Sequence, residues 1–201
     1  MRKTISVIGA GLGGSLLAIL LAQRGFDVML YERRADMRQH VIPAGRSINL
    51  ALAQRGIRPL HKAGLFEQVR KLLIPMRGRM LHDVTGALSF TPYGRTADEV
   101  IHSISRPGLN MLLMDAAEAA GVNIRFGQRC DDVDFAQARA HFTDEASGRQ
   151  YTLDGSPFIA ADGGGSAVRQ AMQHRLGVSV TEDILPHGYK EFTIPAAADG
   201  R

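Results

Sequence analysis

The segment Thr4-Ile-Ser-Val-Ile-Gly9-Ala-Gly11-Leu-Gly-Gly14 decides the predicted fold of this chain. Its first five residues predict a short buried strand, and three glycines follow with the spacing Gly-x-Gly-x-x-Gly. A run rich in leucine and alanine then predicts a helix that ends near Gly25, and Asp27–Tyr31 predicts a second strand. The sequence therefore predicts a strand, a helix and a parallel strand, which is the unit that binds dinucleotides.

Each residue of the turn has a separate part in such a site. Gly9 permits the tight turn out of the strand, Gly11 lets a diphosphate approach the backbone, and Gly14 lets the helix pack against the sheet. Gly13 lies in the same turn, and the helix N-terminus offers N–H groups and a positive dipole end. Glu32, eighteen residues after Gly14, is placed to accept hydrogen bonds from an adenosine ribose. The alternative is a glycine-rich turn with no ligand.

The bulk composition is that of an ordinary globular protein. The chain has 201 residues and a net charge of +4, and its basic residues form no stripe of the kind that binds nucleic acid. The charge fits an anionic cofactor or substrate, although a generic basic surface explains it equally well. Cys130 is the single cysteine, and the seven histidines have no ligand spacing, so we expect neither disulfides nor a metal site. We expect no membrane segment in this chain and a cytoplasmic location.

Further helices and strands follow the opening unit. Arg46–Leu52 is a possible short strand, and Gln54–Lys71 predicts one or two helices broken near Pro59 and Gly64. Gly78–Pro92 predicts a hairpin that leaves the main sheet. The rest of the chain predicts strands at Ile101–Ser105, Val122–Phe126, Val133–Phe142, Tyr151–Leu153 and Phe158–Ala161, and helices from Pro107 to Ala120 and over Ser166–Leu176.

A second motif, Asp162-Gly-Gly-Gly-Ser166-Ala-Val-Arg169, follows the last predicted strand. With the long form of the first motif, which runs through Ala18, Gly25 and Val28 to Glu32, it resembles the single-component flavin hydroxylases. A strand that ends in Asp-Gly brings a carboxylate and a close backbone beside a cofactor diphosphate. The alternative is a plain strand–loop–helix turn with Ser166 as the N-cap.

Several segments narrow the resemblance to the kynurenine 3-monooxygenases, a family of FAD-dependent aromatic hydroxylases. They are Gly45–Leu52, Ile74–Met80, Pro92–Gly94, Ser103–Arg106 with Leu109-Asn110, and Ile184–Tyr189 with Thr193–Pro195. The resemblance implies FAD as cofactor and NADPH as co-substrate. It also implies hydroxylation of L-kynurenine by molecular oxygen, at the ring carbon ortho to the aniline nitrogen.

The resemblance also assigns residues to the two sites. It places the FAD at Gly9, Gly11, Gly13, Gly14, Glu32, Arg33, Ala51, Arg106, Cys130, Asp162 and Gly163. It places the kynurenine carboxylate against Arg79 and Tyr93, and a guanidinium suits a carboxylate because it donates two parallel hydrogen bonds. Without the resemblance, a surface arginine and a packed tyrosine are the better interpretation of that pair. No catalytic acid or base is expected.

The predicted fold class is α/β, a Rossmann-like FAD-binding fold with an inserted, incomplete β-rich substrate domain. We divide the chain into a first FAD-binding part (1–72), the insertion (73–98), a second FAD-binding part (99–178) and the start of the substrate-domain sheet (179–201). Because Glu191–Pro195 predicts a strand with no partner, we expect an N-terminal portion that is poorly active by itself. Another FAD-dependent aromatic hydroxylase and a non-catalytic FAD-binding fragment are the alternatives.

Overall fold

The centre of the molecule is a parallel four-stranded sheet in the order β12-β1-β2-β8. The computed structural model describes residues 2–39, 49–96, 98–154 and 157–186. The sheet consists of β1 (Thr4–Ile8), β2 (Asp27–Tyr31), β8 (Asn123–Arg125) and β12 (Phe158–Ala160). β1 pairs with β2 and with β12, so the first strand of the chain lies inside the sheet. The predicted strand–helix–strand unit is confirmed.

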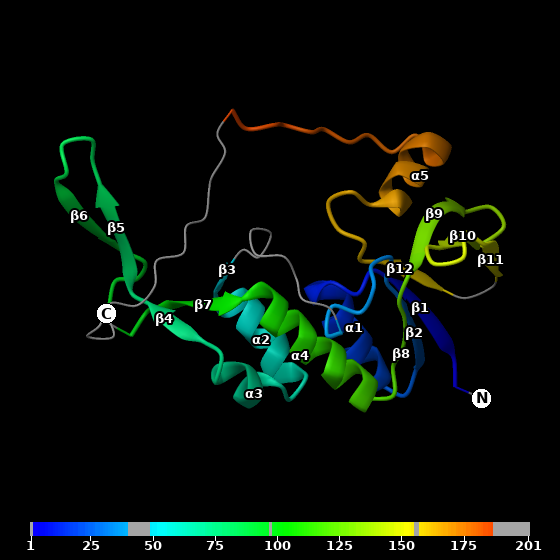
Figure 1. Ribbon diagram of the computed structural model, residues 1–201, viewed down its shortest axis with the longest axis horizontal. Coiled ribbons are helices and arrows are strands. Elements are labelled where there is room, and N and C mark those ends of the chain that lie inside the picture. The colour runs from blue at the N-terminus through cyan, green and yellow to red at the C-terminus, as the bar shows by residue number, and fades with distance from the viewer. Residues whose placement is uncertain (1, 40–48, 97, 155–156, 187–201) are drawn as a thin grey trace.

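Helices cover one face of this sheet (Figure 1). α1 (Leu12–Ala22) and α4 (Arg106–Ala119) pack side by side, and α2 (Gln54–Lys62) and α3 (Phe66–Arg70) lie next to them. A single apolar cluster joins these helices to the sheet. α4 begins with Pro107 in its first turn, as expected, and Gly121 follows its end with a φ of +86°.

A three-stranded antiparallel meander covers the other face (Figure 1). It consists of β9 (Gln128–Asp134), β10 (Arg139–Asp144) and β11 (Gln150–Asp154), and α5 (Ala167–Leu176) packs against β9. A second apolar cluster lies between the meander and the sheet, where the Phe142 ring stacks on Tyr151 and contacts Tyr31 in a tilted arrangement.

Two smaller sheets extend away from this body (Figure 1). β3 (Asn49–Leu52), β7 (Ile101–Ser105) and β4 (Ile74–Met76) form one, with β7 in the middle. β5 (Gly78–His82) and β6 (Leu88–Pro92) form a separate hairpin, as the sequence predicted. Asp83 Oδ1 closes the turn of this hairpin, because it accepts hydrogen bonds from the backbone N–H and the hydroxyl of Thr85 and from the Ala87 N–H.

The structure corrects several sequence-based boundaries. α2 continues through Pro59, because its buried residues Ile57 and Leu60 hold it against the core, and the break occurs only at Gly64, where φ is +74°. The predicted strand Val133–Phe142 is in fact parts of two strands, β9 and β10, with a turn at 135–138. α1 ends two or three residues before Gly25, with Gln23 as its C-cap, and Gly25 follows in the left-handed conformation with a φ of +83°.

Two other predictions, the start of the substrate-domain sheet and the first short strand, fall at the edges of the described ranges. Residues 179–186 form no strand, and the predicted strand Glu191–Pro195 lies outside the described residues. Residues 46–48 of the first short strand also lie outside them, while 49–52 form β3 as expected. Within the described ranges, no helix has the length and apolar character needed to cross a membrane.

Candidate dinucleotide-binding site

The two predicted cofactor motifs meet at the carboxyl ends of β1 and β12. Because these strands are neighbours, the turn after β1 lies against the loop after β12, and the Ala161 N–H donates to the Ile8 carbonyl at 2.7 Å. A Cβ atom on Gly9 would lie 2.5 Å from the Ala161 oxygen, and the φ of Gly9 is +101°. In a sheet of this kind, the point where neighbouring strands send their connections to opposite faces is where ligands bind.

The remaining glycines of the turn divide into two kinds. A Cβ on Gly14 would lie 1.9 Å from the Gly9 oxygen, so Gly14 is required for the packing of α1 on the turn. A Cβ on Gly11 or on Gly13 would meet nothing within 4 Å. The protein's own packing therefore does not explain Gly11 and Gly13, whereas an open cradle for a ligand does.

The N-terminus of α1 is free of a side-chain cap. Its N-cap residue is Gly11, which makes no side-chain bond, while Ser105 and Ser166 cap α4 and α5 by accepting from backbone N–H groups. The first N–H groups of a helix have no partner inside the helix, and together with the helix dipole they favour an anion. These residues fit the diphosphate of a dinucleotide.

Both backbone polar groups of Ala10, which lies between the two glycines of the turn, are held by side chains. Its N–H donates to Glu32 Oε2 at 3.0 Å, and its carbonyl accepts from Ser15 Oγ and from Asn110 Nδ2, each at 3.2 Å. All three side chains are buried. Sequence reasoning gave no role to Ser15 or Asn110, although a polar residue on the apolar face of a predicted helix was a usable signal.

The Glu32 carboxylate has less free capacity to accept hydrogen bonds from a ligand than the sequence suggested. Besides Ala10, its carboxylate accepts from the backbone N–H of Arg34 at 2.9 Å and from Arg34 Nε at 2.8 Å. Burial by itself would raise the pKa of Glu32, but these hydrogen bonds and the Arg34 charge lower it below the ordinary value. The Arg34 side chain is 62% exposed, so it is the partner that a ribose hydroxyl would displace at least cost. The neighbouring Arg33 is exposed beside it.

The Asp162 loop serves α5 as well. Asp162 Oδ1 accepts from Ser166 Oγ at 2.7 Å, and Ser166 Oγ accepts from the Arg169 N–H at 2.9 Å. The N-cap interpretation of Ser166 is therefore correct, and it is compatible with a cofactor at the same loop. Gly163 has a φ of +81°, and an added Cβ there would meet nothing within 4 Å.

The other predicted cofactor residues lie on β3, α4 and β9. Ala51 is exposed on β3 opposite Ser103, and Arg106 is exposed at the first position of α4. Cys130, in contrast, is buried in the second apolar cluster. Burial, with the nearby charges of Asp162 and Asp131, raises the pKa of its thiol to about 12. The thiol is therefore a protonated core group.

The predicted substrate pair lies on the β5–β6 hairpin. Arg79 pairs with Thr91, and the Tyr93 N–H donates to the Arg77 carbonyl at 2.9 Å. Because side chains alternate between the faces of a sheet, Arg79 and Tyr93 share one face, in a diagonal relation. Both are exposed. The hairpin is remote from the glycine turn (Figure 1).

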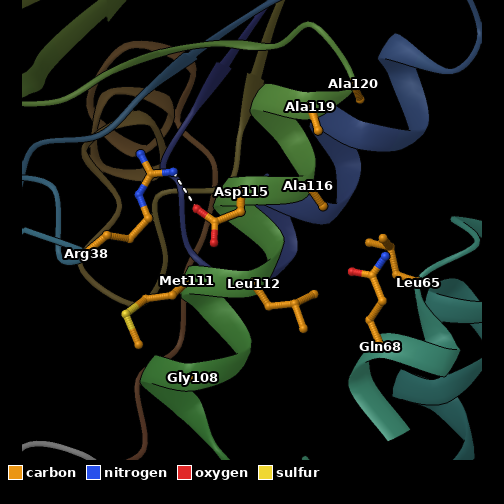
Figure 2. Close-up of a pocket in the computed structure, with 10 residues that line it drawn as sticks. All are labelled: Arg38, Leu65, Gln68, Gly108, Met111, Leu112, Asp115, Ala116, Ala119 and Ala120. Atoms are coloured by element: carbon orange, nitrogen blue, oxygen red, sulfur yellow. Dashed lines mark hydrogen bonds and ion pairs between the residues drawn. The ribbon is translucent and has the colours of Figure 1, made fainter. Parts of the chain in front are cut away.

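A large open groove of about 840 Å³ lies elsewhere, on the outer surface of α4. Figure 2 shows Arg38 at one side of α4, reaching toward Asp115, and Leu65 and Gln68 at the other. None of the predicted cofactor or substrate residues lines this groove. It is a feature distinct from the dinucleotide site.

A known family model matches residues 2–193, almost the whole chain, and it describes an FAD-binding domain. The chain belongs to this family. The open glycine cradle and the uncapped helix of this FAD-binding domain agree with that membership.

Curated relatives match this FAD-binding domain along almost its full length. It is 48% identical over 200 residues to the kynurenine 3-monooxygenase of Myxococcus xanthus, which covers 99% of this chain and 43% of that protein. It is 45% identical to the kynurenine 3-monooxygenases of Xanthomonas campestris and Stenotrophomonas maltophilia, over 98% of this chain and 43% and 44% of those proteins. The chain thus spans less than half the length of the curated relatives it matches.

Solved structures share the fold at lower sequence identity. The flavin-dependent monooxygenase PieE, in complex with FAD and substrate, matches 89% of this chain and 32% of its own with a TM-score of 0.70 at 22% identity. The p-nitrophenol 4-monooxygenase PnpA of Pseudomonas putida matches 89% of this chain and 45% of its own with a TM-score of 0.68 at 18% identity. These likenesses confirm the predicted FAD-binding fold class.

Proposed function

We propose that this chain is the FAD-binding portion of a monooxygenase that hydroxylates L-kynurenine to 3-hydroxykynurenine with NADPH and molecular oxygen. The observation that carries the proposal is the match at 43–48% identity, along 98–99% of this chain, to proteins named kynurenine 3-monooxygenase. The division at residues 72, 98 and 178 and the cytoplasmic location expected from the sequence belong to the same proposal.

The chain's own residues would bind and orient the cofactor. The Gly9–Gly14 turn and the N-terminus of α1 would hold the diphosphate, and Glu32 and Arg33 would hold the adenosine end. Ala51 and Arg106, together with the Asp162-Gly163 loop, would lie along the flavin end. When bound, FAD supplies the redox chemistry, which no side chain here replaces.

Substrate recognition falls to the hairpin in this proposal. Arg79 and Tyr93 share a face, so a guanidinium and a phenol could bind the same amino-acid carboxylate. The main alternative is a chain that binds FAD without catalysis. Because this chain spans less than half of each relative's length, the catalytic part of the proposal is tested in a longer hybrid protein.

The first test is the visible absorption spectrum of the purified chain titrated with FAD. We expect a bound-flavin spectrum for the natural chain. Gly11→Val should weaken FAD binding about tenfold or more, because its side chain would enter the open cradle, a loss equivalent to about 1.4 kcal/mol. Since Gly11 has a φ of −71° and no close neighbours, the fold should persist.

Gly108→Ala is the matched control, because it adds one carbon in the first turn of α4 at ordinary contact distance from Ser105. It should leave FAD affinity unchanged. Equal FAD affinity for Gly11→Val and the natural chain would contradict the cradle.

The substrate part needs a separate experiment. In a hybrid of this chain with the remaining half of the Myxococcus xanthus relative, L-kynurenine should stimulate NADPH oxidation and 4-hydroxybenzoate should not. Stimulation by 4-hydroxybenzoate alone would assign the chain to another aromatic hydroxylase, while FAD binding without any stimulation would favour the non-catalytic alternative.

A further inference from the structure

Asn110 is an exception on the buried face of α4. It is 5% exposed and stands among the buried apolar residues Leu109, Leu113 and Met114 of the same helix. Burial of an amide among such residues destabilises a protein unless its polar atoms find partners. The position therefore requires an explanation other than core packing.

The Asn110 amide donates a hydrogen bond to the glycine turn. Nδ2 lies 3.2 Å from the Ala10 carbonyl oxygen, a residue 100 positions earlier, and 3.2 Å from Met37 Sδ. Both partners can only accept, which fixes the orientation of the amide. Oδ1 is buried and has no hydrogen-bond partner among the described residues. An unpaired acceptor is costly, so the amide is a poor choice for stability alone.

The bond acts on the centre of the cradle. Ala10 lies between Gly9 and Gly11, and its N–H is already held by Glu32 Oε2 at 3.0 Å. Fixing the carbonyl as well sets the plane of the peptide that leads into the uncapped N-terminus of α1. Because a peptide is planar, this carbonyl direction also sets where the Gly11 N–H points.

α4 also holds the segment that follows Glu32. Arg38 Nη1 donates to Asp115 at 2.8 Å and to Glu118 at 2.6 Å, both on α4, and its side chain is seen beside that helix in Figure 2. Met37, next to Arg38, contacts Asn110 itself. One helix thus contacts the turn for the diphosphate and the segment next to the ribose carboxylate.

We propose that Asn110 is a positioning residue for FAD, which holds the Ala10 carbonyl so that the turn is preformed for the diphosphate. This rests on FAD binding, the first part of the proposed function. The role is exerted through Ala10, since Oδ1 and Nδ2 are buried beneath the turn and need not touch the cofactor.

Two substitutions of different size separate this role from packing. Asn110→Leu removes the donor and fills the space, and Asn110→Ala removes the donor and leaves a cavity. Both should weaken FAD binding by a similar factor, about three- to tenfold, as expected for one hydrogen bond. The melting temperature without FAD should differ between them, with Asn110→Leu at least as stable as the natural chain.

Met114→Leu is the control, because it alters the same buried face and keeps the Asn110 amide that donates to the Ala10 carbonyl. It should leave FAD affinity unchanged. Affinity within twofold of the natural chain in both Asn110 variants would overturn the proposal, and so would an affinity loss that appears only in the less stable one.

Hydrogen exchange in the chain without FAD gives a second readout. The amides of residues 10–14 should exchange faster in both Asn110 variants than in Met114→Leu. If the natural chain fails to bind FAD, the proposed function fails, while this exchange measurement still tests whether Asn110 holds the turn. Unchanged exchange in both variants would overturn the inference.

Discussion

At the scale of single residues, the turn after β1 depends on groups that are far away in sequence. Glu32 holds the backbone N–H of Ala10, Asn110 holds its carbonyl, and Ser15 adds a second donor to that carbonyl. Gly9 and Gly14 let the turn pack against Ala161 and α1. The geometry of the cradle is therefore a property of buried polar side chains as much as of glycine.

Glu32→Gln should show the contribution of the Glu32 carboxylate to stability through a change in the pH dependence of unfolding. The folded-state pKa of Glu32 lies below its unfolded value near 4.5, so its stabilising effect is present above that pH and is lost as pH falls through the folded pKa. We expect the variant to lose about 1–3 kcal/mol of unfolding free energy at pH 7, because the Ala10 N–H loses a charged acceptor.

Denaturant titrations of both proteins at several pH values measure this difference. It should shrink below about pH 4, as the natural carboxylate becomes protonated. A difference that stays constant from pH 7 to pH 3 would show that the Glu32 charge contributes nothing.

The sequence could predict some of these residues but not others. The spacing of Gly9, Gly11 and Gly14 after an apolar strand has a local cause, so it indicated the turn directly. The bond from Asn110 to Ala10 depends on how α4 packs beside α1, and no local pattern contains that information. The competition of Arg34 for Glu32 was equally hidden, since it arises from side-chain geometry at the end of β2.

At the scale of elements, the β5–β6 hairpin has two unlike faces. One presents Arg79, Leu81 and Tyr93, and the other presents Met80, His82, Leu88 and Phe90. A two-stranded hairpin has little stability of its own, so changes on its Arg79 face should not propagate to the main sheet. This makes Arg79 suitable for substitution.

Arg79→Ala, in the hybrid described above, should weaken kynurenine binding about tenfold or more through loss of a charge-assisted pair, while FAD remains bound. Kynurenine titrations followed by the flavin spectrum measure both quantities. Arg95→Ala, an exposed arginine beyond the paired residues of the hairpin, is the control. An unchanged kynurenine affinity would remove Arg79 from the substrate site.

Element boundaries were harder to predict than element types. β9 and β10 were merged in part because the turn between them, at 135–138, contains no glycine or proline, only Ala138 with a φ of +51°. Pro59 misled in the opposite direction, since tertiary burial of Ile57 and Leu60 keeps α2 continuous.

At the scale of the whole molecule, one sheet separates two apolar cores. Neighbouring residues of β2 enter different ones, because Leu30 belongs to the cluster under the helices and Tyr31 to the cluster under the meander. Because successive side chains of a strand point to opposite faces, β2 contributes to both cores and links them covalently.

Leu30→Ala and Phe142→Ala should therefore destabilise the same unfolding transition. Each removes a buried side chain, at 0% and 1% exposure, and we expect losses of about 2–5 kcal/mol for each. Thermal unfolding followed by circular dichroism and by tyrosine fluorescence measures this. Two separate transitions, one shifted by each variant, would show that the cores unfold independently.

The position of β1 inside the sheet also constrains how the protein is made. Its partner β12 comes about 150 residues later in the chain, and Asn110 is supplied from a helix that ends at Ala119. The glycine turn is therefore synthesised long before β12 and α4, the elements that contact it, and contacts of such long range form slowly. The nucleotide cradle is among the first parts to be synthesised, but its Asp162 side is synthesised late, so we expect FAD to bind only after translation has passed the Asp162 loop.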